Sequence, residues 1–197
     1  MSNTAEFVRL LGALKREKRL YEVIFFVTSI CNAKCRTCFY WQELNRPGDL
    51  TLDEIEKLTR TMPPFHHLIL SGGEPTLRRE LPEIVHRFYA NNDVRFLNFP
   101  TNGLRPSTSR DFSDRILAEN PALTLSLNFS VDGLAETHDR IRAVPGNFTK
   151  VEEAIEAVQR LRRKWGKRLW VGINTTICEA NYHEMIPLAV PGERERC

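Results

Sequence analysis

Three cysteines lie close together near the start of the sequence. Cys31, Cys35 and Cys38 form the pattern C-x3-C-x2-C. Cysteine thiolates are preferred ligands of zinc and of iron–sulfur clusters. A closed structural zinc site, or a cluster held entirely by thiolates, needs four protein ligands, and this pattern supplies three. A centre with three protein ligands keeps one position open, so the spacing predicts a metal centre that can carry chemistry.

The residues before this pattern indicate how the cysteines are held. Residues 21–30 form a β-branched and aromatic run of about the length of one buried strand. The cysteines therefore follow the C-terminal end of a predicted strand. In α/β sheets and barrels this is the edge at which ligands bind.

Strand-like and helix-like segments alternate along the rest of the chain. Capping boxes at Thr51 with Glu54 and at Thr149 with Glu152 predict helix starts, and Pro82 sits where a first helical turn begins. This order predicts parallel strands joined by right-handed crossovers, hence an α/β fold with an open sheet or a partly closed barrel. Further strands are predicted at about 67–70, 94–99, 123–129 and 169–174, with a last helix at about 182–188.

Each predicted strand ends in a polar or glycine-rich segment. Taken alone, each segment is more typical of a simple turn. Independent turns would be scattered over both ends of a sheet, whereas these all fall at the same end, so together they predict one site. The segments after the cysteine loop are Ser71-Gly72-Gly73-Glu74-Pro75, Pro100-Thr101-Asn102-Gly103, Ser130-Val131-Asp132-Gly133 and Asn174-Thr175-Thr176.

The residue types in these segments suit a small polar ligand. Gly72 and Gly73 allow close approach of the backbone to a ligand, and Glu74 can accept hydrogen bonds from an ammonium group. Short polar side chains that suit hydroxyl groups or a carboxylate are those of Thr101, Asn102, Ser130 and Asp132.

The combination resembles the radical S-adenosylmethionine (SAM) superfamily over roughly residues 21–180. Its specific parts are C-x3-C-x2-C after the first strand and Gly72-Gly73-Glu74-Pro75 after the second. The resemblance implies a partial TIM-like barrel of the (β/α)6 type, of which about five βα units are present here. It also implies a [4Fe-4S] cluster whose open iron binds the amino and carboxylate groups of SAM. Reductive cleavage of SAM then yields a 5′-deoxyadenosyl radical, which abstracts hydrogen from an unidentified substrate.

The resemblance also assigns roles to single residues. It makes Cys31, Cys35 and Cys38 the cluster ligands and places the segment from Gly72 to Pro75, including Gly73 and Glu74, at the methionine amino group. Ser130 and Asp132 match the position that contacts the ribose and the carboxylate. Thr101 and Asn102 lie beside the cofactor or the substrate, and the backbone near Asn174 meets the adenine.

The order Thr-Asn-Gly and then Ser-x-Asp-Gly resembles one branch of the superfamily. That branch contains the molybdenum-cofactor GTP cyclase and the peptide-modifying enzymes. His138 and the arginines after it, Arg140 and Arg142, could then bind substrate, or they could form a polar loop before the next helix. The resemblance implies a reducing electron donor and a small-molecule or peptide substrate as partners. Many members have an aromatic residue before the third cysteine, where this chain has Thr37.

Three regions are predicted: an amphipathic helix over residues 1–20, a core domain over 21–190 and a charged tail over 191–197. No sixth strand is predicted, so a partner could supply the missing edge of the barrel. Two alternatives to an active enzyme are a non-catalytic zinc- or SAM-binding protein and an inactive truncated fragment. In the zinc alternative the fourth ligand would be His66, His67 or His86.

Composition sets the remaining limits. The chain has 197 residues, 42% of them hydrophobic, which is enough for one domain with a core. A net charge of +3 gives no strong case for a nucleic-acid partner. The sequence has no apolar run of the length that a membrane span needs and no secretory leader, so a cytoplasmic location is predicted, where thiols stay reduced.

Overall fold

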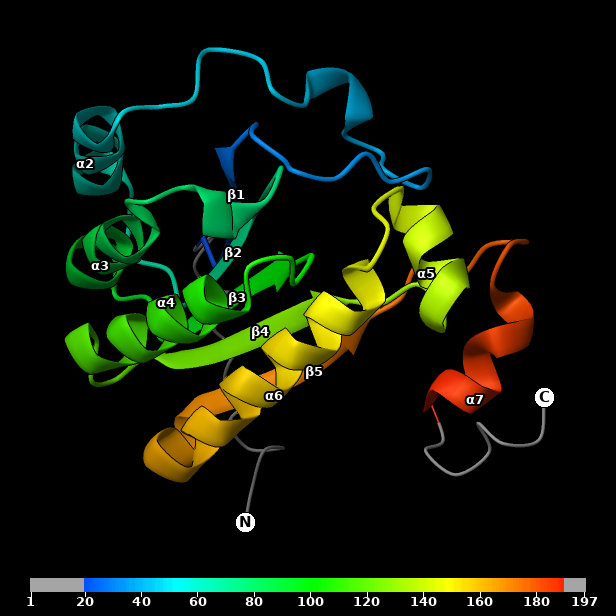
Figure 1. Cartoon of the computed structure of the whole chain (residues 1–197). Helices are drawn as coiled ribbons and strands as arrows, with labels where there is room; N and C mark the ends of the chain where they lie inside the picture. The colour runs from blue at the N-terminus through cyan, green and yellow to red at the C-terminus, as the bar shows by residue number, and fades with distance from the viewer. Residues whose placement is uncertain (1–19, 190–197) are drawn as a thin grey trace.

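The computed structural model describes residues 20–189. Five parallel strands form one sheet in the order β1-β2-β3-β4-β5, as the alternation of segments predicts (Figure 1). The predicted N-terminal helix and charged tail fall almost entirely outside the described residues. The strands are β1 Glu22–Thr28, β2 His67–Gly72, β3 Phe96–Thr101, β4 Thr124–Ser130 and β5 Leu169–Asn174.

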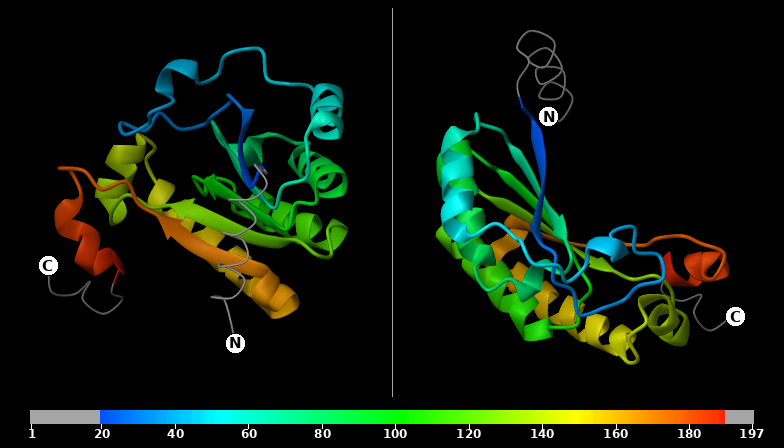
Figure 2. Two further views of the ribbon diagram at one scale, coloured as in Figure 1. Left: turned by 180° about the vertical axis from the view of Figure 1, so that it is seen from behind. Right: turned by 90° about the horizontal axis from the view of Figure 1, so that it is seen from above.

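Four long helices cover the convex face of this curved sheet (Figure 2). They are α2 Leu52–Thr61, α3 Leu81–Asn92, α4 Pro106–Glu119 and α6 Asn147–Trp165. Two shorter helices, α5 Ala135–Arg142 and α7 Met185–Ala189, lie beyond the carboxyl ends of the strands. Short 3-10 turns complete the set at Trp41–Glu43, Pro75–Leu77, Gly166–Arg168 and Tyr182–Glu184.

The sheet stays open, with β1 and β5 as its edges within the described residues, so the partial-barrel prediction is confirmed. Side chains alternate between the two faces because the strand period is two residues. One row across the strands is buried under the helices, and the adjacent row faces the concave side. The buried row is Val23, Leu68, Leu97, Leu125 and Leu169, of which Val23 alone is partly buried, and the concave row is Ile24, Ile69, Asn98, Ser126 and Trp170.

One of the two predicted capping boxes is right and the other is wrong. Thr51 caps α2, and its capping box with Glu54 is complete. Helix α6 begins at Asn147, so Thr149 lies inside the helix and forms no cap. The cause is tertiary: the buried Asn147 side chain bonds His138 and the carbonyl of Asn102, which fixes the start of the helix two residues earlier.

The two glycines at the end of β2 have a role in the fold besides the ligand approach that the sequence suggested. The amide of Gly73 donates to Thr28 O at 2.7 Å, and that of Glu74 donates to Ile30 O at 2.8 Å. A Cβ at Gly72 would lie 2.2 Å from Thr28 O, and Gly72 also has a φ of +121°. The missing side chains therefore let this segment pack against the chain that leads into the cysteines. The close approach is between two backbone segments.

Replacing Gly73 by alanine should destabilise the fold, since the new Cβ would lie 2.2 Å from Ile30 O, and both groups belong to rigid backbone. Overpacking of this kind costs about 1–3 kcal/mol. Gly146→Ala is the control, because its Cβ meets nothing within 4 Å and it carries only the strain of a positive φ, about 1 kcal/mol. Urea unfolding of both variants measures the difference, and equal losses would contradict the steric argument.

Candidate functional site

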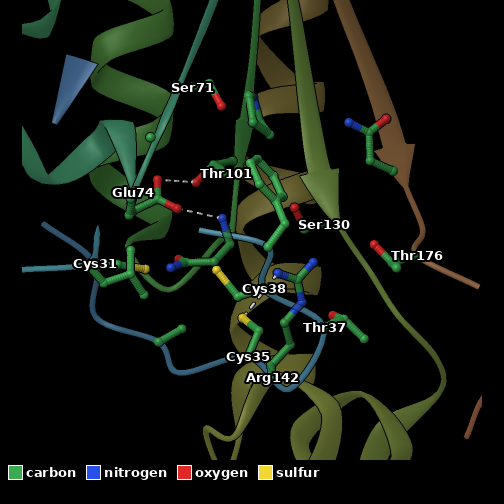
Figure 3. A pocket seen from close by; sticks show the side chains of 18 residues that line it. Cys31, Cys35, Thr37, Cys38, Ser71, Glu74, Thr101, Ser130, Arg142 and Thr176 are labelled. Carbon is green, nitrogen blue, oxygen red and sulfur yellow. Dashed lines mark hydrogen bonds between the residues drawn. The ribbon is translucent and has the colours of Figure 1, made fainter. Parts of the chain in front are cut away.

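The carboxyl ends of the strands enclose a pocket of about 290 Å³ (Figure 3). This is close to the lower limit of volumes that bind small ligands. Most of the residues singled out from the sequence line it, from segments far apart in the chain. The predicted residues among its lining are Cys31, Cys35, Cys38, Gly72, Gly73, Glu74, Thr101, Asn102, Ser130 and Asn174, whereas Pro75 and Asp132 do not line it.

The cysteine loop is fixed to its surroundings by hydrogen bonds that its backbone amides donate. The amide of Cys31 donates to Asn45 Oδ1 at 3.0 Å. The amide of Arg36, between the second and third cysteines, donates to Ile141 O at the end of α5 at 2.8 Å. All three thiols are partly buried and free. The loop therefore presents its thiols to the pocket from a defined position.

The thiols share one pocket without converging on one point. Among residues 20–189, no three His, Cys, Asp or Glu side chains lie close enough to hold a single metal ion. The histidines that the zinc alternative needs lie elsewhere: His67 begins β2, at the opposite end from the cysteines, and pairs with Glu22, and His86 on α3 bonds Asn120. A multi-iron cluster fits the three thiols better, because each thiolate binds a separate iron.

The Cys31 thiol has the most perturbed environment of the three. Burial raises its pKa from 9.0 to about 11, and the nearby charges of Glu74, Cys35 and Cys38 act in the same direction. A hydrogen bond from the backbone of Ala33 opposes this rise. A bound cation would reverse the effect, since metal ligation deprotonates a thiol.

In metal-free protein Cys31 should therefore be alkylated slowly. With a pKa of about 11 in place of 9.0, its thiolate fraction at pH 8 is about 100-fold lower. Alkylation by iodoacetamide, followed by mass spectrometry of the peptide that contains Cys31, should accelerate about tenfold per pH unit between pH 8 and 10. A rate that levels off near pH 9 would contradict the raised pKa.

Glu74 is buried, and its carboxylate ties the ends of β2 and β3 together. Its Oε1 accepts from Thr76 N at 3.1 Å, Thr76 Oγ1 at 2.6 Å and Thr101 Oγ1 at 2.7 Å. Its Oε2 accepts from Asn102 N at 2.7 Å. Burial raises the pKa of the Glu74 carboxyl, and these hydrogen bonds oppose the rise. Oε2 accepts only this one hydrogen bond, so the second of its two lone pairs remains for an incoming donor.

Asp132 lies behind the pocket wall. Its Oδ1 accepts from Thr176 N at 2.8 Å, and its backbone carbonyl accepts from Asn181 Nδ2 at 2.9 Å. Its own amide donates to His138 Nδ1 at 3.1 Å. Asp132 thus joins the end of β4 to the segment after β5, and it reaches the pocket only through the residues that it holds.

His138 is fully buried and is already bonded at both ring nitrogens. Because Nδ1 accepts from the amide of Asp132, Nε2 carries the proton and donates to Asn147 Oδ1 at 3.1 Å. Burial lowers the pKa of this imidazole, and the charge of Arg142 lowers it further. Of the two readings from the sequence, the structure supports a structural role for His138.

Three pocket residues carried little signal in the sequence. Arg142, the last residue of α5, extends its guanidinium into the pocket toward Cys35 (Figure 3). Thr176 lines the pocket from the segment after β5, and Thr37 lines it from the cysteine loop. The sequence offered Arg142 only as a possible substrate-binding residue after the fourth strand, and an arginine near a helix end is commonplace.

Comparison with protein families matches residues 25–185, most of the chain, to the family described as the radical SAM superfamily. The chain belongs to the radical SAM superfamily. Members of this superfamily use a [4Fe-4S] cluster together with SAM, so the cofactors that the resemblance implied are confirmed at the level of the family.

The chain is similar in sequence to two curated proteins. It is 29% identical over 150 residues to the GTP 3′,8-cyclase of Pasteurella multocida, which covers 73% of this chain and 42% of that protein. It is 33% identical over 168 residues to the pre-heme d1 synthase of Dinoroseobacter shibae, with 83% of this chain and 38% of that protein covered. The chain therefore spans about two fifths of the length of these relatives.

Solved structures confirm the fold. Streptococcus suis SuiB aligns with a TM-score of 0.60 at 18% identity, over 96% of this chain and 42% of that one. Native anSMEcpe with bound AdoMet (SAM) aligns with a TM-score of 0.54 at 23% identity, over 80% and 44%. Within residues 20–189, no helix has the length and apolar character needed to cross a membrane.

Proposed function

We propose that this chain is the core of a radical SAM enzyme and that Cys31, Cys35 and Cys38 hold its [4Fe-4S] cluster. The observation that carries this proposal is the shared pocket. The three thiols and the backbone of Gly72 and Gly73 line the same cavity, beneath the ends of the strands. When bound, the cluster and SAM supply a one-electron cleavage that yields methionine and a 5′-deoxyadenosyl radical, which takes a hydrogen atom from the substrate.

Different residues of the chain are proposed to bind different groups of SAM. The Gly72–Pro75 segment offers backbone groups and the last free lone pair of Glu74 Oε2 to the methionine ammonium group, with Pro75 acting only through the turn that it begins. Ser130 offers a hydroxyl group at the end of β4, and Asn174 offers polar groups at the end of β5. Thr101 and Asn102 line the pocket and hold the Glu74 carboxylate. Asp132 acts from behind the pocket wall by fixing the segment that carries Thr176.

The concave face of the sheet leads into this pocket and is the surface proposed for substrate. It carries a polar pair at mid-height, in which Asn128 Nδ2 donates to Asn98 Oδ1 at 2.6 Å. Gly172 leaves room for this pair, since a Cβ there would lie 2.3 Å from Asn128 Oδ1. Amide side chains both donate and accept, so they suit an uncharged polar part of a substrate, such as a peptide bond or a nucleobase edge.

The proposal requires two further partners. One is an electron donor, since each cleavage of SAM consumes one electron. The other is polypeptide at the β5 edge, where Trp170 and Ile173 are exposed and strand hydrogen-bonding groups are open. A partner chain or additional sequence could pair there. No nucleic acid is expected to bind, and we place the protein in the cytoplasm, where its thiols stay reduced.

The test combines spectroscopy with product analysis. Protein reconstituted anaerobically with iron and sulfide should give the electron paramagnetic resonance (EPR) signal of a reduced [4Fe-4S] cluster after dithionite treatment. Addition of SAM should change that signal, and 5′-deoxyadenosine and methionine should accumulate. A cluster signal that is indifferent to SAM would contradict SAM binding. Stoichiometric zinc in place of iron would overturn the proposal altogether.

A further inference from the structure

Arg142 contacts one of the three cysteines directly. Its Nη1 donates to Cys35 Sγ at 3.5 Å, from a side chain that is only 13% exposed (Figure 3). The contact joins positions 107 residues apart in the sequence. Arginine keeps its positive charge at every accessible pH, so this is a permanent cation against a thiol sulfur.

Asp132 holds the guanidinium in this position. Arg142 Nε lies 2.9 Å from Asp132 Oδ2, an ion pair whose angle departs from that of a hydrogen bond. Asp132 is 1% exposed, and its other groups are engaged by Thr176, Asn181 and His138. These contacts hold the Asp132 carboxylate in place. Its ion pair with Arg142 therefore directs the guanidinium toward Cys35.

A second contact fixes the distance between α5 and the cysteine loop. The amide of Arg36, next to Cys35, donates to Ile141 O, next to Arg142. This backbone bond ties the two segments together whatever side chain stands at position 142. The Arg142 side chain is therefore not required to hold the loop, and its burial against a sulfur needs another explanation.

Electrostatics supplies that explanation. The reduction potential of an iron–sulfur cluster depends on its net charge, its solvent exposure and the hydrogen bonds to its sulfurs. A cationic N–H group at a ligating sulfur stabilises the more negative, reduced state, and the groups that orient such a donor tune the centre from outside its ligand set. We infer that Arg142, positioned by Asp132, raises the reduction potential of the cluster through Cys35 Sγ. This inference rests on the proposed function, because it requires a cluster on the three cysteines.

The experiment is a redox titration of the reconstituted full chain without SAM, followed by EPR. R142Q removes the charge and the directed donor, so at a fixed potential the ratio of reduced to oxidised cluster should fall about tenfold, which is about 59 mV for one electron. The matched control is R140Q, which removes the same charge from an exposed position on the same helix. R140Q should titrate like the wild type.

Two further variants separate position from charge. R142K keeps the charge but loses the planar fork that Asp132 orients, so its potential should fall between those of the wild type and R142Q. In D132N the side-chain oxygen remains the acceptor of Thr176 N, so the NH2 group, a donor, faces Arg142 Nε. The guanidinium should then turn away and the potential should fall. If the potential of D132N rose instead, Asp132 would act through its charge alone, and its positioning role would be overturned.

The outcomes distinguish this inference from the proposed function. If the wild type assembles a [4Fe-4S] cluster and R142Q titrates at the same potential, the inference is wrong and the proposed function stands. If the wild type assembles no [4Fe-4S] cluster, the proposed function is wrong, and the inference about Arg142 falls with it. Should R142Q lose its cluster, R142K decides: a lowered potential supports the inference and an unchanged potential overturns it.

Discussion

Replacing Cys35 by alanine is expected to abolish the iron–sulfur cluster and, with it, all SAM cleavage. Two thiolates would remain where the centre needs three protein ligands. The carboxylate of Glu74 lines the same pocket, but it is already held by hydrogen bonds from Thr76, Thr101 and Asn102 and is not free to substitute. Iron and sulfide should fall from about four of each per chain to near zero after anaerobic reconstitution. Colorimetric iron and acid-labile sulfide assays measure the loss directly.

The control for this variant is Cys178→Ala. Cys178 is also a free, partly buried cysteine, but it lies in the segment after β5 and does not line the pocket. It should keep its iron and its EPR signal. The assignment of the cluster to the cysteine loop would be wrong if Cys35→Ala retained full iron and sulfide, or if Cys178→Ala lost them.

The strands were predictable because each is a short apolar run that ends in polar or glycine residues. The predicted segment 169–174 coincides with β5, and 123–129 lies one residue before β4. The order of the segments also predicted that the polar segments gather at one edge, because parallel strands bring their carboxyl ends together. Such local patterns contain enough information to locate the pocket.

The roles of individual side chains were less predictable, because they depend on hydrogen-bond and ion-pair partners that are distant in the sequence. Glu74 resembled a ligand-binding residue, yet most of its acceptor capacity is used by Thr101 and Asn102 and by its neighbour Thr76. Asp132 similarly turned out to hold Arg142 in place behind the pocket wall. These contacts join separate strand ends, and no local pattern specifies which groups will meet there.

Glu74→Ala is expected to lower the free energy of unfolding by about 3 kcal/mol or more. The change leaves the buried amides of Thr76 and Asn102 without their acceptor, and each unsatisfied buried group costs about 1–3 kcal/mol. It also removes the link between the ends of β2 and β3, so SAM affinity should fall in the folded fraction. Urea unfolding at pH 7 measures the loss, with the exposed Glu136→Ala as a control expected to lie within about 0.5 kcal/mol of the wild type.

The difference in unfolding free energy between wild type and Glu74→Ala should depend on pH. This dependence tests whether burial or hydrogen bonding has the larger effect on the pKa of Glu74. Burial raises the pKa of this carboxyl above its ordinary 4.5, so the folded state binds the proton more tightly than the unfolded state. The contribution of Glu74 is then complete below pH 4.5 and declines as pH rises through the raised pKa. The stability gap between wild type and Glu74→Ala should therefore narrow with rising pH. If the gap widened instead, the four hydrogen bonds would outweigh the cost of burying the charge, and Glu74 would be an ionised clamp between the two strand ends.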